Sequence, residues 1–470
     1  MKLRLKSTPW WRRYSINSTV HGIKYLVDDD LHPAERIAWL AVVSLAVFGL
    51  VYSSLLLSRR FSSSPLATVI ESTIYPVSEI PYPAVTICTG NRINWSHVNH
   101  VAERYLNKSS NLQRMKETLK YFLASAVERI LGDEFHVVEK FREMSNQSHR
   151  ELEQVNIGEL LQDVAPRCME IFHEICWWRN KYLNCCSIFT VQFSTYGPCL
   201  SFNSRTGADA PRRSKESDWP WRTSNYGDWS GLRFTMKSPA GVWVIVHHPV
   251  QWPQTAKFIA TGSTTTFTIT PTFTYSSSSV GRFPPAQRGC LLQREISDEN
   301  VMSLPGLIYH LENCIGECRQ RYMMQYCNCS VDFIYPTGSY AVCNATGIRC
   351  IGEFAGQLRH DFVTGHKFDD APAAANTTTL CPMCLPQCRQ VTYGIACESN
   401  PLPFENRDLI TVDIHFRQAT MVKYRTYVVY ELLDLIAVHR STIHSYADAG
   451  YFYVPRHMLY MSNLLALVDG

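Results

Sequence analysis

The first 87 residues of this chain lack cysteine, although the whole sequence of 470 residues has 17. The first cysteine is Cys88. Most Asn-x-Ser/Thr sequons lie on the same side of the chain, and only the one at Asn17 precedes Cys88. Cysteine-rich chains with such sequons are typical of oxidising, extracytoplasmic compartments. The distribution therefore predicts an extracellular region with glycosylation at Asn94, Asn107, Asn146, Asn328, Asn344 and Asn376.

The sequence also lacks the common catalytic motifs: it has no Gly-x-Ser-x-Gly elbow, no P-loop and no dinucleotide fingerprint. His173-Glu174 begins like a zinc-protease motif, but position 177 is Trp177 rather than a second histidine. His247-His248-Pro249 is interpreted as an exposed turn rather than a metal pair. A net charge of +4 is too small to indicate nucleic acid. We therefore predict no enzyme activity, no cofactor, no metal and no nucleic-acid partner.

Charge is absent from one long apolar run, Ile37 to Leu57, whose length as a helix matches the hydrocarbon core of a bilayer. A cleaved signal peptide would start earlier, be shorter and be followed by small residues. A buried helix of a soluble protein seldom stays uncharged for this length. Basic residues precede the run, which places the N-terminus in the cytoplasm by the positive-inside rule; among them are Lys2, Arg4, Lys6, Arg12, Arg13 and Lys24.

A second apolar run of this length is lacking. Residues 427–438 are too few and contain Glu431 and Asp434, while Pro455 and Arg456 interrupt residues 451–468. Charges at the centre of a bilayer are costly. The sequence as given therefore predicts a single-pass protein with a large ectodomain.

The ectodomain pattern predicts the α+β class. Residues 96–167 are mostly helical by apolar spacings of three and four, whereas β patterns start at Phe189 and recur up to residue 430. Helices grouped apart from a largely antiparallel sheet are expected. The polar stretch 205–231 is interpreted as a surface insertion, and its basic cluster 212–215 as a solvated loop.

The cysteines after residue 313 are closely spaced, as Cys314-x3-Cys318, Cys327-x-Cys329 and Cys381-x2-Cys384-x3-Cys388, with Cys343 and Cys350 between them. In the cytosol the first and last groups would suggest zinc, but outside the cell a disulfide ladder is favoured. Residues 309–327 look helical, so that Cys314 and Cys318 share one face and can reach a facing strand.

Several motifs together resemble the degenerin/epithelial sodium channel family, and most of all its insect pickpocket subgroup. The His21-Gly22 pair precedes the apolar run, and Tyr82-Pro-Ala-Val-Thr-Ile-Cys88 resembles the family's FPAVTIC strand. The remaining matches follow in the family's order over residues 15–438; they are Tyr196–Asn203, Gly241–Pro253, Arg288–Cys290, the cysteine block, Ile334–Pro336, Cys384–Cys388 and Val412–Phe416.

The resemblance implies a trimeric, sodium-selective, amiloride-sensitive channel that is gated by ligands or force, lies in the plasma membrane and contacts lipid. Its hand-like ectodomain has finger, thumb, palm, knuckle and β-ball parts. The implied division is a cytoplasmic N-terminus at residues 1–36, a transmembrane helix at 37–57, an extracellular domain at 58–438 and a divergent tail at 439–470. His21 and Gly22 correspond to the gating pair.

Position in the family pattern also implies disulfides. The pairs are Cys88–Cys199, Cys290–Cys388, Cys314–Cys384, Cys318–Cys381, Cys327–Cys350 and Cys329–Cys343. An odd remainder has no implied partner: Cys168, Cys176, Cys185, Cys186 and Cys397.

The resemblance stops at Val438, where the family continues into a second span with a Gly-x-Ser selectivity filter. Residues 439–470 carry no such triplet, and Asn463–Gly470 resembles the approach to that span a second time. We therefore expect a truncated, non-conducting version of a channel subunit, which joins other subunits as a homo- or hetero-trimer. The alternative is a single-pass receptor, or a dominant-negative regulator of full-length subunits.

Overall fold

The computed structural model describes residues 9–18, 22–63, 66–105, 155–173, 175–216, 218–297, 301–353, 381, 383–403 and 407–429. The chain divides into two compact units, each described by itself. The smaller unit comprises residues 1–67 and 427–470, and the larger comprises residues 68–426.

The smaller unit is helical where it is described. It contains α1 (Trp10–Asn17), the 3-10 turn η1 (Ile23–Leu26) and α2 (Pro33–Ser63). The stretch Pro33–Ser53 has a mean hydropathy of 1.8 and is the one helix among the described residues long and apolar enough to cross a membrane. The ring of Trp39 on α2 stacks on Tyr25, with centroids 4.6 Å apart. The apolar run expected to be a helix therefore lies inside a longer one.

The larger unit contains a five-stranded antiparallel sheet with the order β5-β6-β2-β8-β9. Its strands are β2 (Ala84–Thr89), β5 (Phe189–Ser194), β6 (Gly197–Phe202), β8 (Val242–His247) and β9 (Lys257–Ile259). Every residue of β2 and of β6 is buried. These two strands therefore have protein on both faces, and their polar residues Thr86, Thr89 and Ser201 are buried as well.

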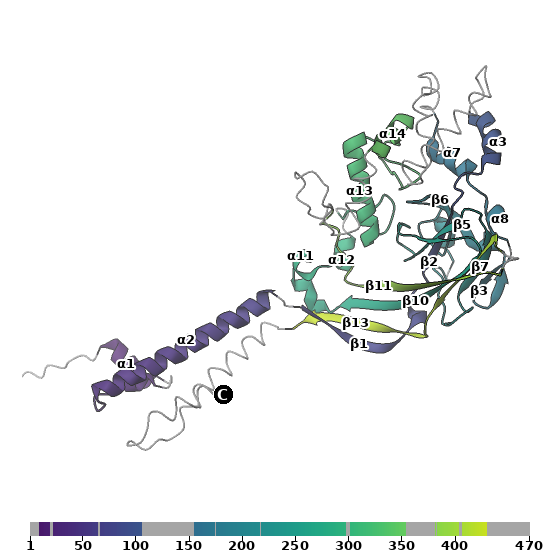
Figure 1. Ribbon diagram of the computed structural model, residues 1–470. Coiled ribbons are helices and arrows are strands. Elements are labelled where there is room, and N and C mark those ends of the chain that lie inside the picture. The colour runs from purple at the N-terminus through teal and green to yellow at the C-terminus, as the bar shows by residue number, and fades with distance from the viewer. Residues whose placement is uncertain are drawn as a thin grey trace, which may run out of the picture. The chain divides into compact units, whose positions relative to one another are not determined.

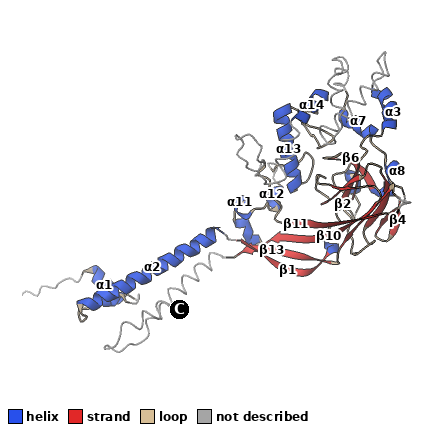
Figure 2. Ribbon diagram, in the orientation of Figure 1, coloured by secondary structure: helices blue, strands red, loops and turns tan. Residues whose placement is uncertain are grey.

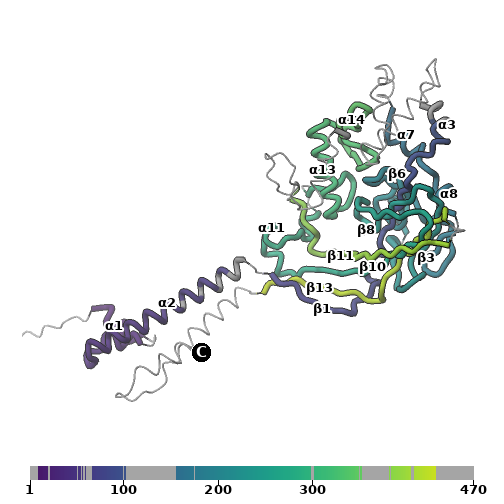
Figure 3. Tube along the Cα trace, viewed as in Figure 1, coloured from purple at the N-terminus to yellow at the C-terminus, as the bar shows by residue number. Residues whose placement is uncertain are grey.

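The second sheet of this unit has eight strands in the order β1-β13-β10-β12-β7-β3-β4, with β11 also paired to β10. Figure 3 shows β1 and β13, from opposite ends of the chain, side by side. The strands are β1 (Leu66–Pro76), β3 (Cys176–Trp178), β4 (Lys181–Leu183), β7 (Leu232–Lys237), β10 (Ser263–Ser276), β11 (Gln390–Pro401), β12 (Leu409–Phe416) and β13 (Thr420–Val428).

This sheet is largely antiparallel but includes two parallel pairings. β11 and β7 run antiparallel to their partners, but β12 and β13 both run parallel to β10. They share one edge of β10: Ser263–Ile269 pair with β12, and Thr272–Ser276 pair with β13. The expected antiparallel pairing holds for β11, β7, β3 and β4, and the two parallel pairs were not expected because strand direction depends on long connections, which leave no periodic signal in the sequence.

Helices lie apart from the two sheets or at their edges (Figures 1 and 2). They are η2 (Val77–Glu79), α3 (Trp95–Tyr105), α7 (Ile157–Val164), α8 (Cys168–Ile171), α9 (Cys185–Ile188), α10 (Ala210–Arg213), η3 (Ser278–Arg282), α11 (Pro285–Arg288), α12 (Gln293–Ile296), α13 (Leu311–Cys327) and α14 (Ala345–Glu353). α3 and α7 fall within the stretch expected to be mostly helical, of which residues 106–154 lie outside the described part.

Two large hydrophobic cores support these elements, beside a small cluster around Cys88, Cys199 and Ile245. One lies between the sheets and includes aromatic rings in mutual contact, with Phe202 near Trp178, Tyr82 and Phe189. The other joins α3, α7, α13 and α14 and includes Leu160 and Tyr335. The two cores hold the sheets and the helical part as separately packed regions.

Candidate functional site

The turn before α2 requires glycine. Gly22 has a φ of +86°, in the left-handed region that residues with a Cβ rarely adopt. A Cβ at this position would lie 2.9 Å from Cγ2 of Val43 and 3.4 Å from the Trp39 ring. Both the backbone and the packing against α2 therefore select glycine here. Its predicted partner in the gating pair, His21, lies outside the described residues.

Polar contacts join β1 to β13 and β10, the strands nearest in the chain to α2 and to residues 430–470. Lys423 Nζ lies 2.8 Å from Glu71 Oε2, and the Tyr275 hydroxyl donates to the other oxygen of Glu71. Thr68 and Thr426 share a hydrogen bond of 2.9 Å between their hydroxyls.

These contacts change the acidity of the groups involved. The hydrogen bond from Lys423 holds the pKa of Glu71 below its usual range, and the same bond raises the pKa of Lys423. The bond to Glu71 raises the pKa of Tyr275. Because Glu71 is exposed, the pair is screened by salt and contributes little to global stability. The Glu71–Lys423 pair therefore links β1 to β13 through a contact that hydrogen bonds to water can replace.

Disulfides cross-link the larger unit. The structure pairs Cys88–Cys199, Cys290–Cys388, Cys314–Cys384, Cys318–Cys381, Cys327–Cys350 and Cys329–Cys343, the pairs that the resemblance implies. Cys314 and Cys318 lie one turn apart on α13, as expected. The described residues that face them, Cys381 and Cys384, lie in a loop instead of the expected strand.

Four of the cysteines without an implied partner also pair. Cys168 bonds Cys186, and Cys176 bonds Cys185, which ties α8 and the β3–β4 hairpin to α9. Cys397 on β11 is a free thiol, and burial raises its pKa. The adjacent Cys185-Cys186 pair was a signal for two neighbouring bridges, but only the fold shows which cysteines approach them.

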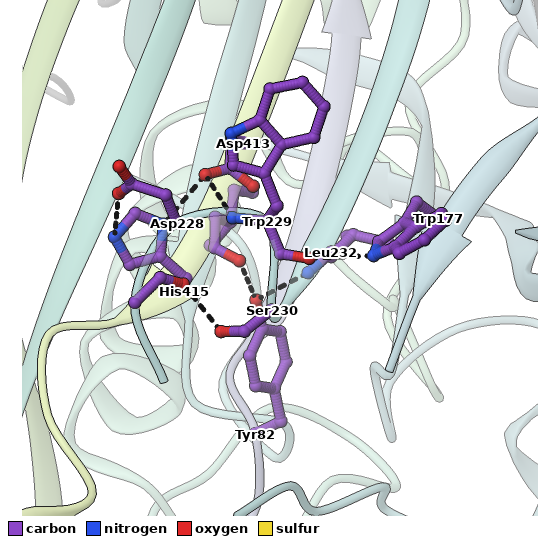
Figure 4. A network of polar contacts seen from close by, with 10 residues as sticks. Tyr82, Trp177, Asp228, Trp229, Ser230, Leu232, Asp413 and His415 are labelled. Atoms are coloured by element: carbon purple, nitrogen blue, oxygen red, sulfur yellow. Dashed lines mark hydrogen bonds and ion pairs between the residues drawn. The ribbon is translucent and has the colours of Figure 1, made fainter. Parts of the chain in front are cut away.

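A buried histidine on β12 lies between two carboxylates (Figure 4). Nδ1 of His415 is 2.8 Å from Oδ2 of Asp413, and Nε2 is 3.2 Å from Oδ1 of Asp228. The side chains of His415 and Asp413 are 3% and 8% exposed, whereas that of Asp228 is 77% exposed. Asp413 and His415 point to the same face of β12 because they are two residues apart in a strand.

Hydrogen bonds fasten the loop that carries Asp228 to the neighbouring strands. Trp229 N donates to Asp413 Oδ2 at 3.3 Å, and Trp177 Nε1 donates to the Trp229 carbonyl at 2.7 Å. The Tyr82 hydroxyl donates to the Ile414 carbonyl at 2.6 Å and accepts from Leu232 N at 3.2 Å. Burial raises the pKa of Tyr82 strongly, so that its hydroxyl stays a donor.

Asp228, Asp413 and His415 are a set of side chains that could hold a metal ion, with ligand atoms within 4.8 Å of one another. The sequence analysis predicted no metal and did not single out these residues. Asp228 lies in the stretch interpreted as a surface insertion, far along the chain from β12. Only the pairing of β7 with β12 brings the two parts together.

The histidine pair 247–248 was expected in an exposed turn, and this was wrong. His247 ends β8, is 3% exposed and contacts the Thr86 hydroxyl through Nε2 at 2.9 Å. Burial lowers the pKa of His247 to about 4 and that of His248 to about 3. The ring of His248 stacks on His310, whose pKa burial lowers to about 4. All three side chains are therefore neutral near pH 7.

The basic cluster at 212–215 is only partly solvated. Arg213 is 7% exposed, forms an ion pair with Asp209 and donates to the Ser187 carbonyl at 2.9 Å. Its guanidinium also lies over the Trp221 ring. The interpretation as a solvated loop was therefore wrong for Arg213, because α10 turns this one side chain inward.

Three of the predicted glycosylation sites are described. Asn328 and Asn344 are exposed. Asn94 is half-buried, and its amide donates to Glu170 at 3.3 Å. Asn107, Asn146 and Asn376 lie outside the described residues.

The family model described as amiloride-sensitive sodium channel matches residues 14–438. Pickpocket protein 19 of Drosophila melanogaster is 25% identical over 464 residues, which cover 92% of this chain and 86% of that protein. Sodium channel protein Nach of the same organism is 24% identical over 437 residues, covering 85% of this chain and 76% of that protein. Pickpocket protein 28, also from D. melanogaster, is 23% identical over 441 residues, covering 81% of this chain and 63% of that protein.

Proposed function

The chain belongs to the amiloride-sensitive sodium channel family, and from this premise we propose that its ectodomain controls a sodium-selective, amiloride-sensitive pore through β1 and β13. The family resemblance inferred from the motifs is confirmed by the match to residues 14–438. Members of the family are plasma-membrane ion channels built from several subunits, not enzymes, and the chain is such a subunit.

The observation that carries the proposal is the pairing of two strands from opposite ends of the ectodomain sequence. β1 follows α2 in the chain, and β13 precedes residues 430–470. Both are joined to β10 directly or through each other, so a displacement of β10 reaches both strands. In this proposal ligand binding or force acts on the ectodomain, and β1 and β13 carry the movement to the membrane.

The proposed topology has a cytoplasmic N-terminus, α2 as the first transmembrane helix and residues 58–438 outside the cell. The finger, thumb, palm, knuckle and β-ball division belongs to the same proposal, as does assembly into homo- or hetero-trimers. The exposed sites Asn328 and Asn344 support glycosylation on that side.

Sodium current tests the proposal. The chain would be expressed in oocytes together with a complete pickpocket subunit, and the current measured with and without amiloride. Gly22→Ala is expected to reduce the current at unchanged surface level, because a Cβ would collide with Val43. Gly306→Ala is the matched control, since Gly306 also has a positive φ but nothing within 4 Å of an added Cβ. Equal currents for both variants would contradict the gating role of Gly22.

The prediction of a non-conducting form concerns residues 439–470, which lie outside the described part and carry no Gly-x-Ser triplet. Sequencing of full-length transcripts across the codons for Tyr430 to Gly470 tests it. Continuation into an apolar span with such a triplet would contradict it. A stop after Gly470, together with reduced current from a co-expressed complete subunit, would support it and the dominant-negative alternative. A stop with unchanged partner current would favour the receptor alternative.

A further inference from the structure

The ring of His415 is held in one orientation by a buried carboxylate. Asp413 Oδ2 lies 2.8 Å from Nδ1, and both side chains are buried. Because a carboxylate oxygen only accepts, Nδ1 donates to Asp413, and Nε2 is the nitrogen that can bind a metal ion in exchange for its ion pair with Asp228. This carboxylate–histidine arrangement is the one that orients metal-binding histidines and raises the basicity of the ligating nitrogen.

Nε2 of His415 faces an exposed carboxylate at a distance that suits an ion pair and also two ligand atoms of one metal ion. Nε2 and Asp228 Oδ1 are 3.2 Å apart. Zinc binds histidine nitrogen and carboxylate oxygen at about 2.0–2.2 Å in tetrahedral geometry, which separates two ligand atoms by roughly 3.4 Å. One ion therefore fits between these two atoms with almost no movement of β12. The high exposure of Asp228 gives the ion access from solvent.

A second observation comes from the buried carboxylate itself. Asp413 Oδ1 is buried and has no hydrogen-bond partner among the described residues, although Oδ2 has two. A buried charge of this kind is costly unless a cation compensates it. The neighbouring strand β7 carries a cation, Arg233, at the position opposite Asp413 in the strand register. The guanidinium of Arg233 lies over the Trp229 ring. A divalent ion bound to Nε2 of His415 would add positive charge near Asp413, on the side of the imidazole ring opposite to this carboxylate.

We propose that Asp228 and His415 bind a divalent transition-metal ion of the zinc class, with Asp413 as the positioning residue for His415. Nitrogen and carboxylate ligands suit zinc better than calcium or magnesium, which prefer sets of oxygen ligands. Water would complete the coordination, so that the affinity is lower than in a closed four-ligand site. The bound ion would fix the loop 227–230 against β12. The inference does not depend on the proposed channel function.

Calorimetric titration of the full chain in detergent micelles tests the site, with Zn²⁺ as the probe and Ca²⁺ as the comparison. Asp228→Asn is expected to weaken zinc binding by roughly tenfold or more, because it removes a ligand. Asp218→Asn is the matched control, since Asp218 is an exposed aspartate of the same polar stretch. Absence of zinc binding to the unmodified chain, or equal affinity after Asp228→Asn, would overturn the proposal.

Two further variants distinguish the role of His415 as a metal ligand from the role of Asp413 as a positioning residue. His415→Gln is expected to abolish zinc binding, whereas His173→Gln, at an exposed histidine, leaves it unchanged. Asp413→Asn is expected to weaken binding by roughly 10–100-fold, while the visible absorption bands of bound Co²⁺ keep their shape because both ligands remain. Altered bands in that variant would contradict a positioning role. If His415→Gln fails to fold, the exposed Asp228→Asn still decides the proposal.

Discussion

The two sheets of the larger unit are held together in different ways. In the five-stranded sheet, β2 and β6 are buried along their whole length and pack against aromatic rings. At the β1–β13 end of the eight-stranded sheet, most residues of β1 are exposed, and polar side-chain contacts such as that between Glu71 and Lys423 stand beside the stacking of Tyr75 on Phe273. The buried sheet therefore depends on packing, and the exposed end depends more on polar contacts whose partners water can replace.

The difference assigns mechanical roles to the two regions. Close-packed strands move as a body, because any gap between them loses many contacts at once. Strands held by exposed polar pairs separate at low cost and so have lower local stability. In a channel subunit, a stiff sheet suits a frame for the ectodomain, and a separable end suits the strands adjacent to the membrane span.

The largest expected effect is in the packed region. Phe202→Ala removes a fully buried ring that contacts Trp178 and Trp221, with centroids 4.9 and 5.1 Å away. We expect the free energy of unfolding to fall by about 3–5 kcal/mol, measured by chemical unfolding of the full chain in micelles. Val191→Ala, on the exposed face of β5, is the control. A comparable loss in the control would show that the two faces of this sheet do not differ.

Acid should weaken the same region. His247 is neutral when folded because burial lowers its pKa from 6.5 to about 4. Its contribution to stability is therefore complete above pH 6.5 and is lost as the pH falls from 6.5 to about 4. The loss amounts to about 3 kcal/mol at pH 4.

Thermal midpoints of the unmodified chain and of His247→Gln, measured between pH 7 and 4, check this effect. The thermal midpoint of His247→Gln should fall less steeply with falling pH than that of the unmodified chain. The thermal midpoint of His173→Gln, a change at an exposed position, should fall as steeply as that of the unmodified chain. Parallel curves for the unmodified chain and His247→Gln would refute the assignment to this residue. Because His248 and His310 also have lowered pKa values, some decline remains in the variant.

A smaller effect is expected where the buried sheet meets β12. Tyr82→Phe removes the hydroxyl that donates to the Ile414 carbonyl and accepts from Leu232 N. Two buried backbone groups then lose a partner, which costs about 1–3 kcal/mol in the free energy of unfolding. Chemical unfolding measures the loss, with Tyr182→Phe on the exposed β4 as the control. No loss in Tyr82→Phe would mean that water replaces the hydroxyl.

The smallest effect on global stability is expected at the exposed end. Lys423→Gln breaks the contact with Glu71 and should leave the thermal midpoint unchanged, while hydrogen exchange of the β1 amides becomes faster. High salt should reduce the difference between the variant and the unmodified chain, because salt screens the original pair. The double variant Glu71→Lys with Lys423→Glu should restore slow hydrogen exchange of the β1 amides. If β1 amides exchange equally in all three proteins, the pair does not hold the strand.

Features that repeat at short range could be predicted from the amino-acid sequence. The uncharged run from Ile37 predicted the helix that the structure shows as part of α2, and alternation predicted β12. The spacing of Cys314 and Cys318 predicted that both disulfide-forming cysteines lie on one face of α13. Such features depend on neighbours within a few residues, so that their physical cause is present in the local sequence.

Contacts between residues far apart in the chain could be identified from the folded structure alone. The parallel pairing of β10 with β12 and β13, the burial of His247 and Arg213, and the partners of Cys185 and Cys186 left no local signal. The same holds for Asp228 and His415, which belong to a loop and a strand far apart in the chain. Long-range contacts are selected by the packing of whole elements, and a polar residue has the same local pattern whether its partner is water or a buried carboxylate.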